Sequence, residues 1–200
     1  MPAARKTIRT PYPPEGFRYQ GDLITPLEEA ELVAEIEKLS LKEYQFQGYL
    51  GKRRTTSFGL QYEGTTGDVQ PIPEFLAPLR EKAAFFAGLD PGDLQYVLVT
   101  EYTPGSPIGW HRDRPMFEDV IGVSLLSLCV FRFRRSIKEG WQRHSVILNP
   151  RSVYLLRGPS RSEWQHSIPE VKSLRYSITF RSLRAGTTDM VVSDVSRSDL

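Results

Sequence analysis

Hydrophobic positions repeat with a helical period in the first half of this chain and with a strand-like alternation in the second half. Residues 24–40, ITPLEEAELVAEIEKLS, carry an apolar stripe at helical spacing. Thr25 is suited to cap this helix, with Pro26 at its first position and Glu28 three residues after the cap. We expect the helix to pack on the outside of a sheet.

A second helical pattern runs from about residue 73 to residue 88 and closes at Gly88. Pro78 lies inside this pattern, and because proline is disfavoured within helices, the regular part is expected to begin there. The following DPGD, residues 90–93, is typical of a turn.

Beyond residue 94 the apolar segments become short and rich in β-branched and aromatic residues, with Gly, Pro, Asn and charged clusters between them. This half therefore predicts an all-β sandwich, barrel or jelly roll rather than a parallel α/β sheet. The expected strands are LQYVLVTEY, VIGVSLLSL, CVFRFRR, HSVILN, SVYLLRG and RYSITFRSL.

The two ends of the chain lack these patterns. Residues 1–20 are Pro-rich and basic and are expected to form an extended lead-in, and residues 185–200 are expected to form a loosely held tail. A length of 200 residues with 40% hydrophobic content fits one domain, here 21–184. We expect it to be a monomer.

Composition excludes several classes of protein. No apolar run reaches the length of a membrane span, and the N-terminus lacks the apolar core of a secretory signal, so a cytoplasmic location is expected. Cys129 is the sole cysteine, expected as a buried strand thiol. A net charge of +2 does not by itself indicate a nucleic-acid partner. Arg132 and Arg134 share one strand face in VFRFRR, which is typical of a solvated surface.

One stretch carries candidate metal ligands. In GWHRDRPMFED, residues 109–119, His111 and Asp113 point the same way in an extended chain and can bind one ion together. A second imidazole comes from His166 in SRSEWQHSIP or from His144 in QRHSVILN. Two imidazoles and one carboxylate make the facial triad of non-heme Fe(II) oxygenases, and ligand chemistry alone does not choose between the two histidines.

The strand RYSITFR places Arg175, Ser177, Thr179 and Arg181 on one face. Its length of about 20 Å is a gap that two long arginines and a five-carbon diacid can close together. Because guanidinium binds carboxylate in a bidentate way and stays charged when desolvated, two such groups in one pocket indicate a dianion.

Taken together, these residues resemble the AlkB-type dioxygenases, which depend on Fe(II) and 2-oxoglutarate. The resemblance rests on EYTPGSPIGWHRD, LNPRSVYLLRGPSRSEWQHSIP and RYSITFR. It implies an α+β fold with a double-stranded β-helix (jelly roll) core, about residues 94–184, and helices packed on the outer face of one sheet. It also selects His166 over His144, so that the implied Fe(II) ligands are His111, Asp113 and His166.

The resemblance assigns the cosubstrate pocket as well. Arg175 would pair with the distal carboxylate of 2-oxoglutarate, helped by Tyr102 and Ser177, and Arg181 with the carboxylate next to the keto group. Thr100 stands where relatives commonly have asparagine, and it can donate one hydrogen bond there. Dioxygen would be the other cosubstrate.

The substrate implied by the resemblance is an alkylated base in DNA or RNA, demethylated to give succinate, carbon dioxide and formaldehyde. Residues of RRTTSFGLQYEG would form a lid, about 50–70, in which the aromatic side chains either stack on an extruded base or pack against the sheet. Alternatives are hydroxylation of a transfer RNA base or a protein side chain, and a cupin-like module that binds metal without oxygenase activity. The expected substrate contacts are Arg53, Arg54, Phe58, Tyr62, Arg112 and Trp164.

The remaining residues of the metal-ligand stretch also have expected places. Alternation turns Trp110 away from His111, so Trp110 is expected to be core or support. The charged side chains around it are expected at the rim of the pocket, namely Arg112, Arg114, Glu118 and Asp119.

Overall fold

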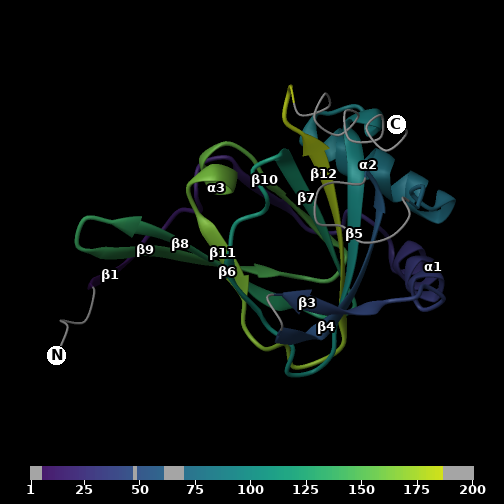
Figure 1. The fold of residues 1–200 in the computed structure, drawn as a ribbon, viewed down its shortest axis with the longest axis horizontal. Helices are drawn as coiled ribbons and strands as arrows, with labels where there is room; N and C mark the ends of the chain where they lie inside the picture. Colours follow the sequence, from purple (N-terminus) through teal and green to yellow (C-terminus); the bar gives the residue numbers. More distant parts are fainter. Residues whose placement is uncertain (1–5, 47–48, 61–69, 187–200) are drawn as a thin grey trace, which may run out of the picture.

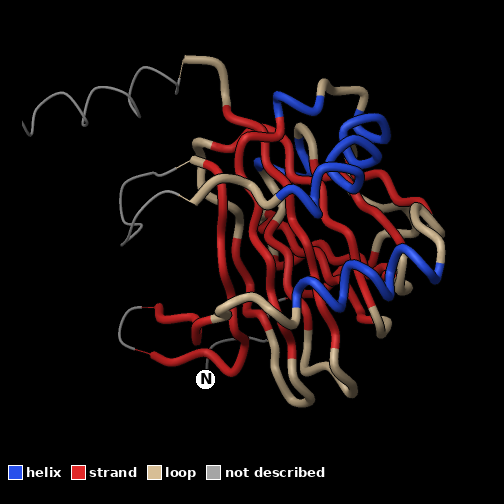
Figure 2. The backbone as a smooth tube through the Cα atoms, turned by 90° about the vertical axis from the view of Figure 1, so that its right-hand side faces the viewer, coloured by secondary structure: helices blue, strands red, loops and turns tan. Residues whose placement is uncertain are grey.

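The computed structural model describes residues 6–46, 49–60 and 70–186, which form mostly β-structure with the two longer helices on one side (Figures 1 and 2). The strands are β1 (Lys6–Arg9), β2 (Phe17–Gln20), β3 (Lys42–Phe46), β4 (Tyr49–Gly59), β5 (Leu94–Tyr102), β6 (Ile108–His111), β7 (Phe117–Leu125), β8 (Cys129–Ile137), β9 (Gly140–Leu148), β10 (Ser152–Leu156), β11 (Gln165–Ile168) and β12 (Arg175–Leu183).

These strands form two sheets within the described residues. The major sheet has the order β2-β10-β7-β12-β5-β4-β3, and the minor sheet has the order β1-β9-β8-β11-β6. Neighbouring strands are antiparallel except β1 and β9, which are parallel. Strand β12 lies between β7 and β5, and strand β6 is the edge of the minor sheet.

Both predicted helices are present, and the first ends earlier than its apolar stripe predicts. Helix α1 (Pro26–Ile36) starts with a full capping box, in which the Glu28 amide donates to the Thr25 hydroxyl and the Thr25 amide donates to the Glu28 carboxylate. Helix α2 (Ala77–Ala87) follows a short 3-10 turn η1 (Glu74–Leu76). Gly88 ends it with a φ of 68°, a left-handed conformation that glycine adopts without strain.

Two further short elements connect the strands. The expected turn at residues 90–93 contains the 3-10 element η2 (Pro91–Asp93), and α3 (Pro159–Ser162) lies between β10 and β11. The longer apolar stripe predicted for the first helix continues past its end, where Leu39 still packs against the core.

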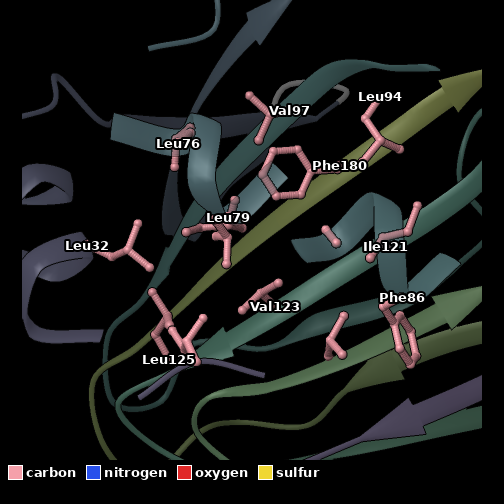
Figure 3. Packing of buried hydrophobic residues seen from close by; sticks show 14 of the residues in the cluster. Leu32, Leu76, Leu79, Phe86, Leu94, Val97, Ile121, Val123, Leu125 and Phe180 are labelled. Carbon is pink, nitrogen blue, oxygen red and sulfur yellow. The ribbon is translucent and has the colours of Figure 1, made fainter. Parts of the chain in front are cut away.

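Two apolar layers hold the sheets. One lies between the major sheet and helices α1 and α2. Figure 3 labels ten of its residues, among them Leu32, Leu79 and Phe180. The other lies between the sheets and joins Phe131 and Phe133 of β8 to residues of the major sheet such as Tyr154. Burial of such side chains is the main driving force for folding.

The ends of the chain and the lid require corrections. The expected lead-in is not separate from the domain, because β1 pairs with β9 and β2 pairs with β10. The first part of the expected lid is strand β4, which pairs with β5 inside the major sheet. The rest of the lid at 61–69 and the expected tail from 187 onward lie outside the described residues.

Cys129 is buried at the start of β8, as expected for a strand thiol. Among the described residues, no helix combines the length and the apolar character that crossing a membrane requires.

Candidate active site

Three candidate ligands meet between the two sheets. His111 is the last residue of β6, and Asp113 lies two residues after it. His166 lies on β11 directly opposite His111 in the antiparallel register. Their ligand atoms all lie within 4.8 Å of one another. His166 Nε2 is 3.5 Å from Asp113 Oδ2, and the two imidazole rings are 4.2 Å apart at their centroids. The register of two short strands therefore brings residues 55 positions apart to one point.

Contacts around the histidines fix their orientation. The Nδ1 atom of His111 is 2.9 Å from the carbonyl oxygen of Gly109. A hydrogen bond there selects the tautomer protonated at Nδ1, so the electron pair of Nε2 is free to bind a metal. The ring of His166 stacks on Phe131 with centroids 5.2 Å apart. The His111 ring is thus oriented to bind through Nε2, and stacking holds the plane of the His166 ring.

Asp113 is positioned by Arg181 of β12. The Nε and Nη2 groups of this arginine both donate to Asp113 Oδ1, at 2.9 and 2.7 Å. The other carboxylate oxygen, Oδ2, is buried without a hydrogen-bond partner and is the one facing His166. One oxygen is therefore occupied and the other is available, which fits a monodentate metal ligand.

The charge states also suit metal binding. Burial, together with the neighbouring His111, lowers the pKa of His166 to about 3, against the opposing effect of Asp113. Burial likewise lowers the pKa of His111. Burial alone would raise the pKa of Asp113, but the positive charge of Arg181 holds it well below its usual range. Two neutral imidazoles and an ionised carboxylate are the forms that bind a divalent cation.

A buried cation marks the second half of the site. Arg175 is fully buried at the start of β12, its Nε donates to Ser124 Oγ at 3.0 Å, and both terminal nitrogens lack a hydrogen-bond partner. Its guanidinium carbon lies 5.0 Å from the centroid of the Tyr102 ring. Since burying an unpaired charge is costly, this arginine is suited to receive an anion.

Hydroxyl side chains flank that cation in register. Ser177 pairs with Thr100 of β5 on one side and with Ser124 of β7 on the other. All three side chains are buried, and their hydroxyls form a polar row across the sheet, two residues along β12 from Arg175. As the alternation predicts, Arg175, Ser177, Thr179 and Arg181 share one face, and the residues between them pack in the helix-side core.

Arg181 makes a contact that the sequence did not predict. Two of its donor groups are used on Asp113, and Nη1 is the one without a partner. Of its five N–H groups, both on Nη1 and the second on Nη2 thus remain to donate to a cosubstrate carboxylate. Its first task in this arrangement is to hold the carboxylate ligand.

Sequence reasoning missed Tyr154 and Gly122. The Tyr154 ring lies across Gly122 of the neighbouring strand, where an added Cβ would be 2.2 Å from the ring. The Tyr154 ring lies 4.9 Å from the Phe131 ring, on which His166 stacks, so it borders the ligand site. Burial raises the pKa of Tyr154 well above its usual range, and the charge of Asp113 adds to this rise. A glycine inside a β-branched run such as VIGVS often marks a close approach and was the available signal.

Several expected substrate contacts are corrected by their placement. Phe58 pairs with Val97 and packs into the helix-side core, and Arg54 extends from that same face of β4 to form an ion pair with Glu101. They point away from the triad, so neither is placed to touch a base. Trp164 is buried against Phe133 in the core between the sheets.

Other members of the expected set lie nearer the opening. Arg53 alternates to the triad side of β4. Burial raises the pKa of Tyr102 and the charge of Arg53 opposes this rise, whereas burial lowers the pKa of His111 and the charge of Arg53 adds to that fall. Arg112 is exposed and donates to the Ser162 carbonyl at 3.0 Å. Tyr62 lies outside the described residues.

The expected rim is only partly correct. Arg112, Arg114 and Glu118 are exposed, but Asp119 is buried and accepts two hydrogen bonds from Arg157, at 2.9 and 2.7 Å. His144, the competing imidazole, contacts the Thr10 carbonyl at 2.8 Å and is not part of the cluster of ligand atoms.

Comparisons with known proteins agree with this geometry. The family described as the 2OG-Fe(II) oxygenase superfamily matches residues 26–181. The chain is 28% identical over 201 residues to the Alkylated DNA repair protein ALKBH8 homolog of Arabidopsis thaliana, covering 82% of this chain and 57% of that protein. It thus spans little more than half the length of that relative. It is also 28% identical over 187 residues to the uncharacterized protein L905 of Acanthamoeba polyphaga mimivirus, covering 84% and 85%.

Solved structures share the fold. The structure of OsALKBH1 superposes with a TM-score of 0.68 at 17% identity, covering 86% of this chain and 100% of that one. An oxidoreductase of the 2OG-Fe(II) oxygenase family from Burkholderia pseudomallei gives a TM-score of 0.59 at 12% identity, covering 84% and 85%. The expected double-stranded β-helix with helices on the outer face of one sheet is confirmed.

Proposed function

The chain belongs to the 2OG-Fe(II) oxygenase superfamily, and from this premise we propose that it removes alkyl groups from nucleobases of DNA or RNA. It is an AlkB-type dioxygenase that uses Fe(II), 2-oxoglutarate and dioxygen. Relatives in this family differ in their targets, so the choice of substrate is argued from the site and tested separately.

The donor set fits Fe(II). His111, Asp113 and His166 offer two nitrogens and one oxygen, the combination that leaves positions open on non-heme iron for other ligands. The unpartnered Oδ2 of Asp113 supports this assignment, because a bound cation would satisfy it. We assign these three residues as the metal ligands.

The cosubstrate fits the remaining polar groups. Arg175 would bind the distal carboxylate of 2-oxoglutarate through its two terminal nitrogens, with Ser177, Thr100 and Tyr102 alongside it. Nη1 of Arg181 would donate to the carboxylate next to the keto group. This fully buried, unpaired guanidinium beside a three-residue ligand cluster is the observation that carries the proposal.

The bound metal and cosubstrate would supply oxidative decarboxylation, giving succinate and carbon dioxide, and hydroxylation of a substrate C–H bond. When the hydroxylated carbon is attached to a base nitrogen, the product falls apart to formaldehyde and the free base. The protein's own part is to hold the ligand geometry through Arg181, to neutralise the diacid, and to exclude water with the aromatic layer around Phe131.

A nucleic-acid substrate is supported by positive charge near the opening. Arg53 acts electrostatically on His111 and Tyr102, and Arg112 and Arg114 are exposed beside the metal ligands. Phosphate groups prefer such surroundings. The name of the Arabidopsis relative, an alkylated DNA repair protein, points to the same class of substrate.

The test is a screen of methylated DNA, RNA and transfer RNA oligonucleotides with Fe(II), ascorbate and 2-oxoglutarate, in which formaldehyde and succinate are both measured. We expect stoichiometric release of both from at least one methylated substrate. Arg175→Met is the matched negative control, since it keeps the metal ligands. Succinate with a gain of one oxygen and no loss of methyl would replace demethylation with base or side-chain hydroxylation.

A further inference from the structure

The outer face of the minor sheet carries arginines stacked on tryptophans. Strand β8 alternates so that Phe131 and Phe133 point into the core between the sheets while Arg132 and Arg134 point outward. The register places Arg143 of β9 opposite Arg134. Trp110 of β6 and Trp141 of β9 lie on the same face. We call Arg132, Arg134, Arg143, Trp110 and Trp141 the arginine–tryptophan face.

These side chains pack against one another as flat layers. The Arg134 guanidinium lies 4.5 Å from the Trp110 ring centroid and 4.4 Å from that of Trp141. Arg132 and Arg143 lie 5.0 and 5.8 Å from the Trp110 ring. Stacking of this kind orients guanidinium groups and reduces the entropy lost when they bind a ligand. The face is thus organised in advance.

The positive charges of this face have no counter-charge. Among the described residues, none of Arg132, Arg134 and Arg143 forms an ion pair, and none has an acidic neighbour in register. Arg132 and Arg134 donate through Nε to Ser167 and Gln165, and their terminal nitrogens have no hydrogen-bond acceptor among the described residues.

Two observations show that this clustering is costly. The Nε atom of Arg143 is buried without a hydrogen-bond partner. Burial lowers the pKa of Arg134, and the like charges of Arg143 and Arg132 lower it further. Like charges held together without acids indicate a surface whose partner is an anion. Arg9 of β1 lies opposite Arg143 and extends the positive row.

The face lies on the reverse side of the strands that carry the metal ligands. Trp110 precedes His111 on the edge strand β6, and Ser167 follows His166 on β11. An extended polyanion that crosses the edge of the minor sheet can therefore contact the outer face while one of its residues enters the site. From β6 to β9 the face spans three strand spacings, about 14 Å, which matches several backbone phosphates.

We propose that the arginine–tryptophan face binds the phosphate backbone of single-stranded nucleic acid beside the base that enters the active site. This proposal rests on the proposed function. It adds a second contact, between the arginine–tryptophan face and the nucleotides next to the target base. Nucleic acid is favoured over an acidic protein because half-buried tryptophan rings lie among the arginines, an arrangement suited to bases as well as phosphates.

The test measures binding without turnover. Fluorescence anisotropy with a labelled, unmethylated 20-residue oligothymidine would be recorded from low to high salt for the wild type and for the triple variant Arg132→Gln, Arg134→Gln, Arg143→Gln. Loss of three phosphate contacts should reduce the salt slope of log K by about 2, or roughly 50-fold in affinity at 0.15 M salt. Arg143→Gln alone should cost about 4-fold by the same slope, which keeps the test valid if the triple variant fails to fold.

Arg18→Gln is the matched control. Arg18 also lies over an aromatic ring, 4.8 Å from the centroid of Phe86, but it is on β2 of the major sheet. Its replacement should leave the salt slope unchanged, because it lies away from the proposed path. An equal loss in Arg18→Gln, or no loss in Arg143→Gln, would overturn the proposal. Competition by polyglutamate as strong as by unlabelled oligothymidine would assign the face to an acidic protein instead.

Failure of this proposal is separable from failure of the demethylase assignment. Binding of an unmethylated oligonucleotide requires no catalysis, so it is unaffected if the methylated screen gives no formaldehyde. If demethylation occurs, the Arg143→Gln variant should raise KM for a 20-residue substrate several-fold and leave KM for a methylated nucleoside unchanged. An equal change in both would mean that the substitution disturbs the site and not the flanking contact.

Discussion

Replacing Arg175 with methionine should separate stability from cosubstrate binding. In the free protein Arg175 is a buried cation whose terminal nitrogens have no partner, so its removal should not lower the free energy of unfolding. In the complex, two charge-assisted hydrogen bonds to a carboxylate are lost, each worth about 1.5–3 kcal/mol. The dissociation constant of the diacid should therefore rise by about two to four orders of magnitude.

The assay is thermal unfolding with Mn(II) and N-oxalylglycine, which bind without turnover. At a ligand concentration 100 times its Kd, the wild type should gain about 2.7 kcal/mol, or about 5–11 °C in Tm for a domain of this size. Arg175→Met should gain about 1 °C or less at the same concentration, because the ligand no longer exceeds its Kd. A variant with a lower Tm in the free form and an undiminished ligand shift would refute the reasoning.

Three further substitutions test other parts of the site. Asp113→Ala should abolish Mn(II) binding, measured by electron paramagnetic resonance, and retained stoichiometric binding would contradict the ligand assignment. Gly122→Ala should destabilise the fold by about 1–3 kcal/mol, because the added methyl group meets the Tyr154 ring. In a double-mutant cycle measured by chemical unfolding, Tyr154→Leu should relieve most of that cost, and additive effects of the two substitutions would exclude the contact. Arg157→Met should lower the free energy of unfolding by about 3–5 kcal/mol, because it leaves the buried carboxylate of Asp119 unpaired. The Tm shift caused by N-oxalylglycine should persist. An unchanged free energy of unfolding would show that this ion pair does not stabilise the fold.

Local signals in the sequence predicted what local physics determines. The Thr25 capping box and the Gly88 helix end depend on residues within one turn, and both were predicted correctly. The shared face of Arg175 and Arg181 follows from strand alternation alone. Such features need no knowledge of what the strand pairs with.

Register across the sheets could not be predicted from these patterns. Whether Phe58 faces the site or the core depends on its pairing with Val97, which is 39 positions away in the chain. Strand β1 pairs with β9 more than 130 residues later, so a short polar segment looked like a separate lead-in. Because a shift of one residue reverses every side chain, patterns without register leave the facing side open.

Contacts between side chains inside the site could not be predicted for a related reason. Trp164 was expected as a substrate contact but is buried in the core between the sheets, because an apolar side chain near a metal ligand can belong to either the core or the pocket. Arg181 was expected to bind the cosubstrate as a full fork, yet the fold brings Asp113 within reach of two of its donors. Tyr154 contributes through its fit over Gly122, which only the strand pairing reveals.

The convergence of three ligands and one buried guanidinium is tested most directly by diffraction from crystals soaked with Mn(II) and N-oxalylglycine. The account predicts a single anomalous peak at bonding distance from His111, Asp113 and His166, with the distal carboxylate of the ligand against Arg175. A peak that lacks any of these three ligands, or a diacid bound away from Arg175, would contradict it.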